Sequence, residues 1–115
     1  MIDFKSYQPE NNADVLVVEL SGRLDSESAE TFFERLEQEL KAGHNKLIFD
    51  CKLLTNISSL GFGMMMRAHS RLKQAGGAVR FSRLEGFIEE AFQIVGFNKL
   101  FENFRSIEDA AASFD

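Results

Sequence analysis

Asn56-Ile57-Ser58-Ser59-Leu60-Gly61-Phe62-Gly63 is the stretch in which a strand pattern changes to a helix pattern. Residues 46–51 (KLIFDC) before it are mostly apolar and β-prone, which predicts a short strand. Residues 62–75 after it carry apolar side chains at helical spacing, which predicts a helix. Ser58 and Ser59 are therefore expected where this helix begins.

A serine at the start of a helix has two uses. The first N–H groups of a helix have no partner within it, and the helix dipole places partial positive charge at this end. A serine hydroxyl can accept a hydrogen bond from one of these groups, and a phosphate on that serine would be stabilised by them. Position alone leaves both roles open for Ser58 and Ser59.

The rest of the chain alternates between strand and helix patterns, which favours parallel pairing through right-handed crossovers and a hairpin as an antiparallel edge. The predicted elements are a hairpin over 2–7 and 15–20, helices over 29–40 and 85–95, a strand over 78–82, a short strand or irregular return over 98–104, and a final short helix over 106–112. Ser26 or Ser28 is a plausible cap of the first helix, and Glu37 and Lys41 have the spacing of an ion pair on its exposed face.

Length and composition narrow the class of protein. A chain of 115 residues is expected to form one domain over 1–115, with a core filled by its twelve Phe. The net charge of −5 and the absence of a Lys/Arg cluster argue against nucleic-acid binding. The longest uncharged apolar run, residues 60–66, is too short to cross a membrane, and the first residues lack a signal-peptide pattern. We therefore expect a cytoplasmic protein that uses neither DNA nor a membrane.

The sequence lacks the residue patterns of catalytic and metal sites. Cys51, His44 and His69 do not have metal-ligand spacing, no nucleotide-binding fingerprint is present, and neither serine has a nearby base in sequence. We expect no enzymatic activity, no cofactor and no metal. One alternative is a phospho-aspartate switch on Asp50, which is expected at the end of its strand.

Several short motifs, taken in order along the chain, resemble those of one family. They are Leu20–Asp25 (LSGRLD), Leu47–Asp50 (LIFD), Ile57–Gly63 (ISSLGFG), Ala75–Gly77 (AGG) and Ile94–Phe97 (IVGF). Together they resemble a STAS domain, and most closely a stand-alone bacterial anti-sigma factor antagonist. The resemblance implies an α/β fold with a mixed four- to five-stranded β-sheet, an N-terminal β-hairpin and about four α-helices.

The same resemblance assigns roles to the serine stretch. In the family this loop usually reads Asp-Ser-x-Gly and its serine is phosphorylated, so Ser59 matches the phosphorylation site and Gly61 the glycine. Ser58 stands where the family usually has Asp and is an alternative acceptor. Asp25 matches an acid that lies near the serine loop. The partner-binding residues implied are Asp25, Ser58, Ser59, Leu60, Gly61, Phe62 and Met66.

The resemblance implies partner switching as the function. The partners would be an anti-sigma factor serine/threonine kinase, which binds the unphosphorylated chain, and a PP2C-type phosphatase, with the chain itself a monomer or weak dimer. The output would be control of transcription in the cytoplasm. The alternative is a STAS scaffold that is never phosphorylated, for example an accessory subunit of a transporter or a regulator of secretion or motility.

Overall fold

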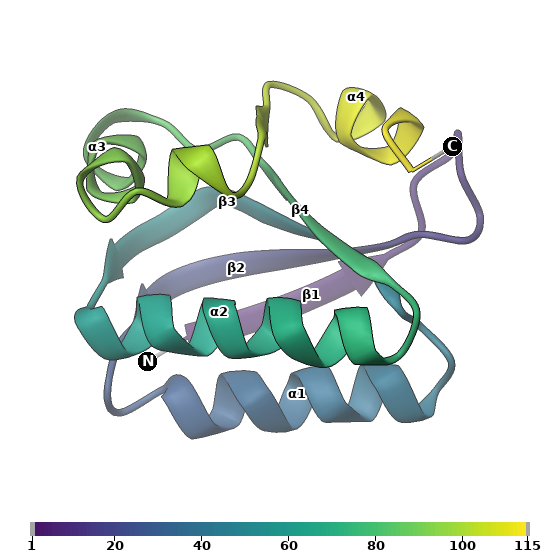
Figure 1. The fold of residues 1–115 in the computed structure, drawn as a ribbon, viewed down its shortest axis with the longest axis horizontal. Helices are drawn as coiled ribbons and strands as arrows, with labels where there is room; N and C mark the ends of the chain where they lie inside the picture. Colours follow the sequence, from purple (N-terminus) through teal and green to yellow (C-terminus); the bar gives the residue numbers. More distant parts are fainter. Residues whose placement is uncertain (1, 115) are drawn as a thin grey trace.

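A five-stranded mixed sheet forms the centre of the computed structural model, which describes residues 2–114. The strands lie in sequence order, with β1 antiparallel to β2 and all other neighbours parallel. The elements are β1 (Ile2–Tyr7), β2 (Leu16–Leu24), α1 (Ala29–Lys41), β3 (Lys46–Ile57), α2 (Ser59–Gln74), β4 (Ala78–Ser82), α3 (Gly86–Ile94), the 3₁₀ turn η1 (Phe97–Lys99), β5 (Asn103–Phe104) and α4 (Ile107–Ala112). Over the described residues this confirms the predicted mixed sheet, N-terminal hairpin and four α-helices (Figure 1).

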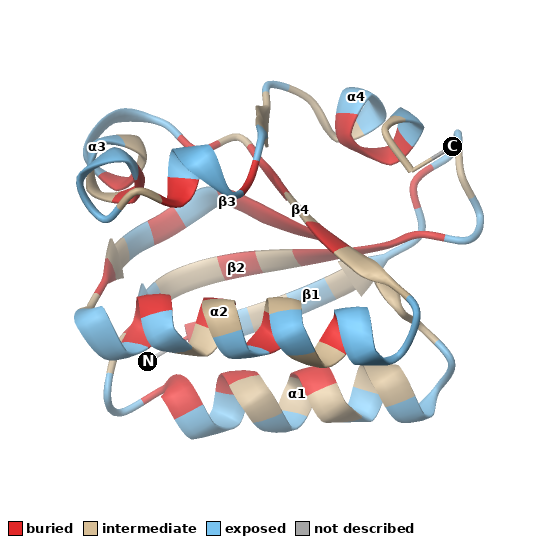
Figure 2. Ribbon diagram, viewed as in Figure 1, coloured by how far each residue is buried: buried red, intermediate tan, exposed pale blue. Residues whose placement is uncertain are grey.

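The centre of the sheet is buried on both faces, as the apolar pattern of β2 predicts. Leu16, Val18 and Leu20 join the larger core beneath α1, α2 and α3, whereas Val17 joins a smaller cluster under α4. Figure 2 shows the buried residues running along the strands and along the sides of α1 and α2 that face them. Strands that are covered on both faces are typical of parallel sheets.

Phenylalanine rings in contact run through the larger core. The ring centroids are 5.4 Å apart between Phe32 and Phe49 and 5.7 Å apart between Phe49 and Phe81. The series continues from Phe81 to Phe92 and from Phe92 to Phe62, at 5.3 Å each. Aromatic pairs of this kind contribute about 0.5–1.5 kcal/mol each beyond the area they bury. The rings therefore tie α1, α2 and α3 to the sheet, as expected of a core filled by Phe.

Strand β3 is longer than predicted and leads directly into α2. It runs past the expected end at Cys51 because Leu54 and Ile57 are buried and its second half still pairs with the end of β2. Helix α2 begins at Ser59 rather than at Phe62. Only one residue therefore separates the strand from the helix.

The predicted ion pair between Glu37 and Lys41 is wrong. Glu37 instead accepts hydrogen bonds from Arg71 of α2, from Nε at 2.8 Å and from Nη2 at 3.3 Å. Two parallel bonds of this kind match the planar fork of a guanidinium to a carboxylate. The pair therefore links α1 to α2, which sequence spacing within one helix does not predict.

An ion pair between the buried Asp50 and the partly exposed Arg83 joins β3 to the segment after β4. The Asp50 carboxylate accepts hydrogen bonds from Nε of Arg83 at 3.0 Å and from its Nη2, and from the Lys52 N–H at 3.2 Å. The hydrogen bond to Asp50 raises the pKa of Arg83. Arg83 has a φ of +60°, which is uncommon outside glycine. Burial and pairing of Asp50 argue against the alternative of a phospho-aspartate switch at this residue.

Replacing Arg83 by methionine should be strongly destabilising, because it leaves the Asp50 carboxylate buried without its partner. Breaking one side of a buried pair costs about 3–5 kcal/mol, so we expect Arg83→Met to lower the free energy of unfolding by about 3 kcal/mol, since Arg83 is partly exposed. Urea denaturation at pH 7 measures the change. The control is Arg105→Met at an exposed position, which should stay within about 0.5 kcal/mol of the parent. Equal stability of both variants would contradict a structural role for the buried pair.

Candidate functional site

The start of α2 carries both serines, as predicted. Ser58 is the N-cap residue, with extended backbone angles, and its Oγ accepts a hydrogen bond from the Gly61 N–H at 3.1 Å. Ser59 is the first residue of the helix and is exposed. The first turn contains no acidic residue. Ser58 therefore does the capping and leaves the Ser59 hydroxyl on the surface.

The end of β2 lies against this first turn. The Ser58 N–H donates to the Leu24 carbonyl oxygen at 3.0 Å. A Cβ on Gly61 would lie 2.4 Å from the same oxygen and 2.9 Å from Cγ1 of Ile57. Side-chain carbons do not come this close to other atoms, so position 61 requires glycine. The strand end and the helix start are thus held together by a backbone contact.

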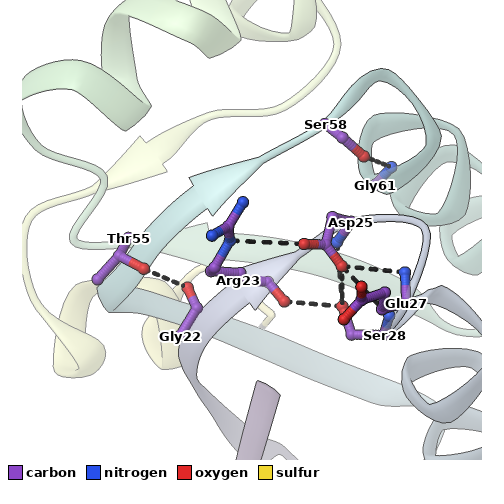
Figure 3. A network of polar contacts seen from close by, with 8 residues as sticks. All are labelled: Gly22, Arg23, Asp25, Glu27, Ser28, Thr55, Ser58 and Gly61. Atoms are coloured by element: carbon purple, nitrogen blue, oxygen red, sulfur yellow. Dashed lines mark hydrogen bonds and ion pairs between the residues drawn. The ribbon is translucent and has the colours of Figure 1, made fainter. Parts of the chain in front are cut away.

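Asp25 follows directly after β2, and its carboxylate organises the turn into α1. Its Oδ1 accepts hydrogen bonds from the Glu27 N–H at 3.1 Å, the Ser28 N–H at 3.3 Å and the Ser28 hydroxyl at 3.3 Å (Figure 3). Partial burial opposes ionisation, but the two backbone hydrogen bonds outweigh it and lower the pKa of Asp25. Asp25 is therefore an ionised acid close to the serines.

Ser28 is the N-cap residue of α1, although its side chain does not cap the helix. Its hydroxyl donates to the Arg23 carbonyl oxygen at 2.7 Å instead. The prediction of Ser26 or Ser28 as the cap is thus right in position for Ser28 and wrong for the hydrogen bond, because the Ser28 Oγ accepts from the Asp25 N–H at 3.0 Å instead.

The other predicted partner-binding residues differ in exposure. Leu60 is 47% exposed beside Ser59, and Met66 is half-buried. Phe62 is only 8% exposed, because its ring packs edge-on against Phe92 and Phe97 at 5.3 and 5.1 Å. Phe62 and Gly61 are both buried under the first turn of α2, so they offer little surface to a partner. Contact of these residues with a partner stays a prediction.

The histidine of α2 is not placed to activate either serine. His69 lies ten residues after Ser59, about 15 Å along the helix. Its ring packs against Phe101 at 4.9 Å, and burial, with a smaller contribution from the charge of Lys73, lowers the pKa of His69. Cys51 is buried, which raises the pKa of its thiol. His69 and Cys51 are therefore packed side chains, the first half-buried and the second buried.

Residues 2–114 contain neither a metal-binding cluster nor a helix suited to a membrane. No group of three or more His, Cys, Asp or Glu side chains is placed to hold a metal ion within that range. Among the described residues, no helix combines the length and the apolar character needed to cross a bilayer.

Sequence reasoning did not single out Arg23, which lies beside Asp25. Its Nε is 3.5 Å from Oδ2 of Asp25, and its side chain is 60% exposed. The signal in the sequence was the two-residue spacing, since alternate residues of a strand point to the same face. Arg23 therefore brings a positive charge to the surface that carries Asp25 and the serines.

Comparison with known proteins shows what the chain is similar to. Residues 6–110 match the family model of the STAS domain. BtrV of Bordetella bronchiseptica, provisionally named an anti-sigma factor antagonist, is 30% identical over 100 residues, which cover 87% of this chain and 86% of BtrV.

Two solved structures share the fold. A provisionally named anti-sigma factor antagonist from Thermotoga maritima gives a TM-score of 0.85 at 18% identity, covering 96% of this chain and 93% of that protein. The Bacillus cell fate determinant SpoIIAA in its phosphorylated form gives 0.71 at 18% identity, covering 98% and 100%.

Adding a methyl group at position 61 should disrupt the contact between β2 and α2. Gly61→Ala places a carbon against the Leu24 carbonyl, and forcing extra atoms into a packed site costs about 1–3 kcal/mol. Gly63→Ala is the matched control, because a Cβ there meets nothing within 4 Å. In a helix this control should raise the free energy of unfolding by up to about 1 kcal/mol. Thermal or urea unfolding of both variants gives the comparison, and a tolerated Gly61→Ala would contradict the close approach.

The two serines should differ in their effect on stability. Ser58→Ala removes the cap on the Gly61 N–H and should cost about 1 kcal/mol, whereas Ser58→Asp should retain most of the cap. Ser59→Ala at the exposed position should change the free energy of unfolding by less than about 0.5 kcal/mol. Urea unfolding of the three variants tests this division. A larger loss in Ser59→Ala than in Ser58→Ala would reverse the assignment.

Proposed function

Because the chain belongs to the STAS domain family, we propose that it is an anti-sigma factor antagonist that acts by partner switching. Unphosphorylated, it binds an anti-sigma factor serine kinase through the surface around Ser59, and phosphorylation of Ser59 releases it. The observation that carries this proposal is the exposed Ser59 hydroxyl at the first position of α2, free of the capping role that Ser58 fills. The chain itself catalyses nothing in this scheme.

The switch needs one group transfer in each direction. The kinase moves the γ-phosphoryl group of ATP to Oγ of Ser59, so a bond from phosphorus to Oγ forms while the bond to ADP breaks and the hydroxyl proton leaves. A PP2C-type phosphatase reverses the state by hydrolysis, with water supplying the oxygen of the released phosphate. Both enzymes need access to Oγ, and Ser59 is exposed. The use of ATP places the exchange in the cytoplasm.

Electrostatics explains why a phosphate on Ser59 would end binding. A phosphoserine carries close to two negative charges at neutral pH. In the free protein these charges stay in water near the positive end of α2. Docking of a partner over Leu60 and Ser59 would remove that water. A penalty of about 3–4 kcal/mol weakens binding roughly 10²- to 10³-fold, which is enough for a switch.

The relatives support the proposal from two directions. BtrV, which matches most of this chain, carries the name of an anti-sigma factor antagonist. SpoIIAA, which shares the fold, has been solved in a phosphorylated form. The alternative function is that of a scaffold that is never phosphorylated, and the observation that favours it is Ser58 in place of the Asp that the family usually has. A phosphorylation assay separates the two functions.

Incubation with each anti-sigma factor kinase of the source genome and ATP, followed by phosphosite mapping, should give phosphate on Ser59. Ser59→Ala should abolish labelling and keep the partner bound, and Ser58→Ala should still be labelled, because only its cap is lost. By calorimetry, Ser59→Asp should bind the kinase at least about tenfold more weakly than the parent, since it adds one charge rather than two. If Ser59→Asp binds as tightly as the parent, or if no kinase labels the chain, the scaffold function is the better account.

A further inference from the structure

Arg23 can move away from Asp25 without disturbing the hydrogen bonds that hold the Asp25 carboxylate in place. Arg23 reaches Oδ2 of Asp25 at 3.5 Å, whereas Oδ1 holds the hydrogen bonds from Glu27 and Ser28. Asp25 thus keeps its place and its backbone partners without Arg23. The arginine side chain is 60% exposed, and exposed pairs of this length are weak. A stronger anion within reach would therefore draw the guanidinium away.

The register of the sheet places Arg23 near the start of α2, because Arg23 pairs with Asn56, three residues before Ser59. Leu24 pairs with Ile57, so Asp25 and Ser58 are the next residues at the ends of two neighbouring parallel strands. Such strands lie about 4.8 Å apart, and Ser59 is one residue further along. Figure 3 shows Arg23 paired with Asp25 at the end of β2, with Ser58 at the end of the neighbouring strand β3, where the turn into α2 begins.

We propose that Arg23 changes partner when Ser59 is phosphorylated, leaving the Asp25 carboxylate and pairing with the phosphate. This inference rests on the proposed function, because it requires phosphate on Ser59. A dianionic phosphate binds a guanidinium through two parallel hydrogen bonds and is a stronger acceptor than one carboxylate oxygen at 3.5 Å. No covalent step is involved beyond the phosphorylation itself.

Because of the exchange, the phosphorylated and unphosphorylated surfaces differ in the charge at Asp25 as well as in the phosphate itself. In the unphosphorylated chain Arg23 covers the charge of Asp25, so a partner meets a nearly neutral pair. After the exchange, Asp25 is left ionised without its cation, because hydrogen bonds from Glu27 and Ser28 still hold it in place. The partner would then meet a second uncovered negative charge, at the residue after the end of β2.

The test uses the full chain with phosphoserine installed at position 59 during translation, so that no kinase is needed. Phosphorus NMR then follows the second pKa of the phosphate at low ionic strength. A neighbouring guanidinium favours the dianion, so Arg23→Gln should raise this pKa by roughly 0.2–0.7 pH units, the size expected of a surface pair. Arg23→Lys should restore most of the difference, and the Nε–H resonance of Arg23 should shift with the same titration.

The control variant is Lys52→Gln, which removes an exposed positive charge from β3. Lys52 lies on the order of 20 Å along the strand from Ser59, beyond the screening length of about 8 Å at physiological salt, and should leave the phosphate pKa unchanged. An equal pKa in the parent and in Arg23→Gln would overturn the exchange. That result would not affect the proposed function. The proposed function fails instead if no kinase labels Ser59 or if Ser59→Asp binds the kinase as tightly as the parent.

Discussion

The contact between the Leu24 carbonyl oxygen and the first turn of α2 determines how the candidate site is assembled. The Ser58 N–H donates to this oxygen at 3.0 Å, and Gly61 has no Cβ that would collide with it. Because β2 and β3 are parallel, their carboxyl ends meet at one edge of the sheet, where ligand and partner sites of open α/β folds lie. The contact brings the turn into α1 and the start of α2 together at that edge.

Capping and the proposed phosphorylation would use the same helix end without competing for the same residue. Ser58 takes the Gly61 N–H, so the helix starts at a fixed residue whether or not Ser59 is modified. Ser59 at the first helical position is near the positive end of the helix dipole, yet its side chain is exposed. The rings of Phe62, Phe92 and Phe97 pack against one another beneath this turn. A charge added at Ser59 therefore changes the surface more than the fold.

Periodicity in the sequence predicted features that depend on neighbouring residues and missed those that depend on distant ones. Apolar spacing was sufficient for the hairpin, the order of strands and helices and the serines at a helix start, because each is set by local pattern. The partner of Glu37 was wrong, since Arg71 lies 34 residues away and approaches only when α1 packs on α2. The pair of Asp50 with Arg83 was missed for the same reason. The extent of β3 was underestimated because polar residues on its exposed face hid its buried Leu54 and Ile57.

A serine rather than an aspartate at position 58 increases the difference in surface charge between the unphosphorylated and phosphorylated states of the proposed switch. An aspartate there would cap α2 equally well, since Asp and Ser are both preferred N-cap residues. It would also place a permanent negative charge beside Ser59, which a partner would have to accommodate in both states. With Ser58 the helix start is uncharged until Ser59 is modified, and Asp25 is covered by Arg23. The unphosphorylated surface is therefore closer to neutral, so the phosphate produces a larger relative change in the charge that a partner meets.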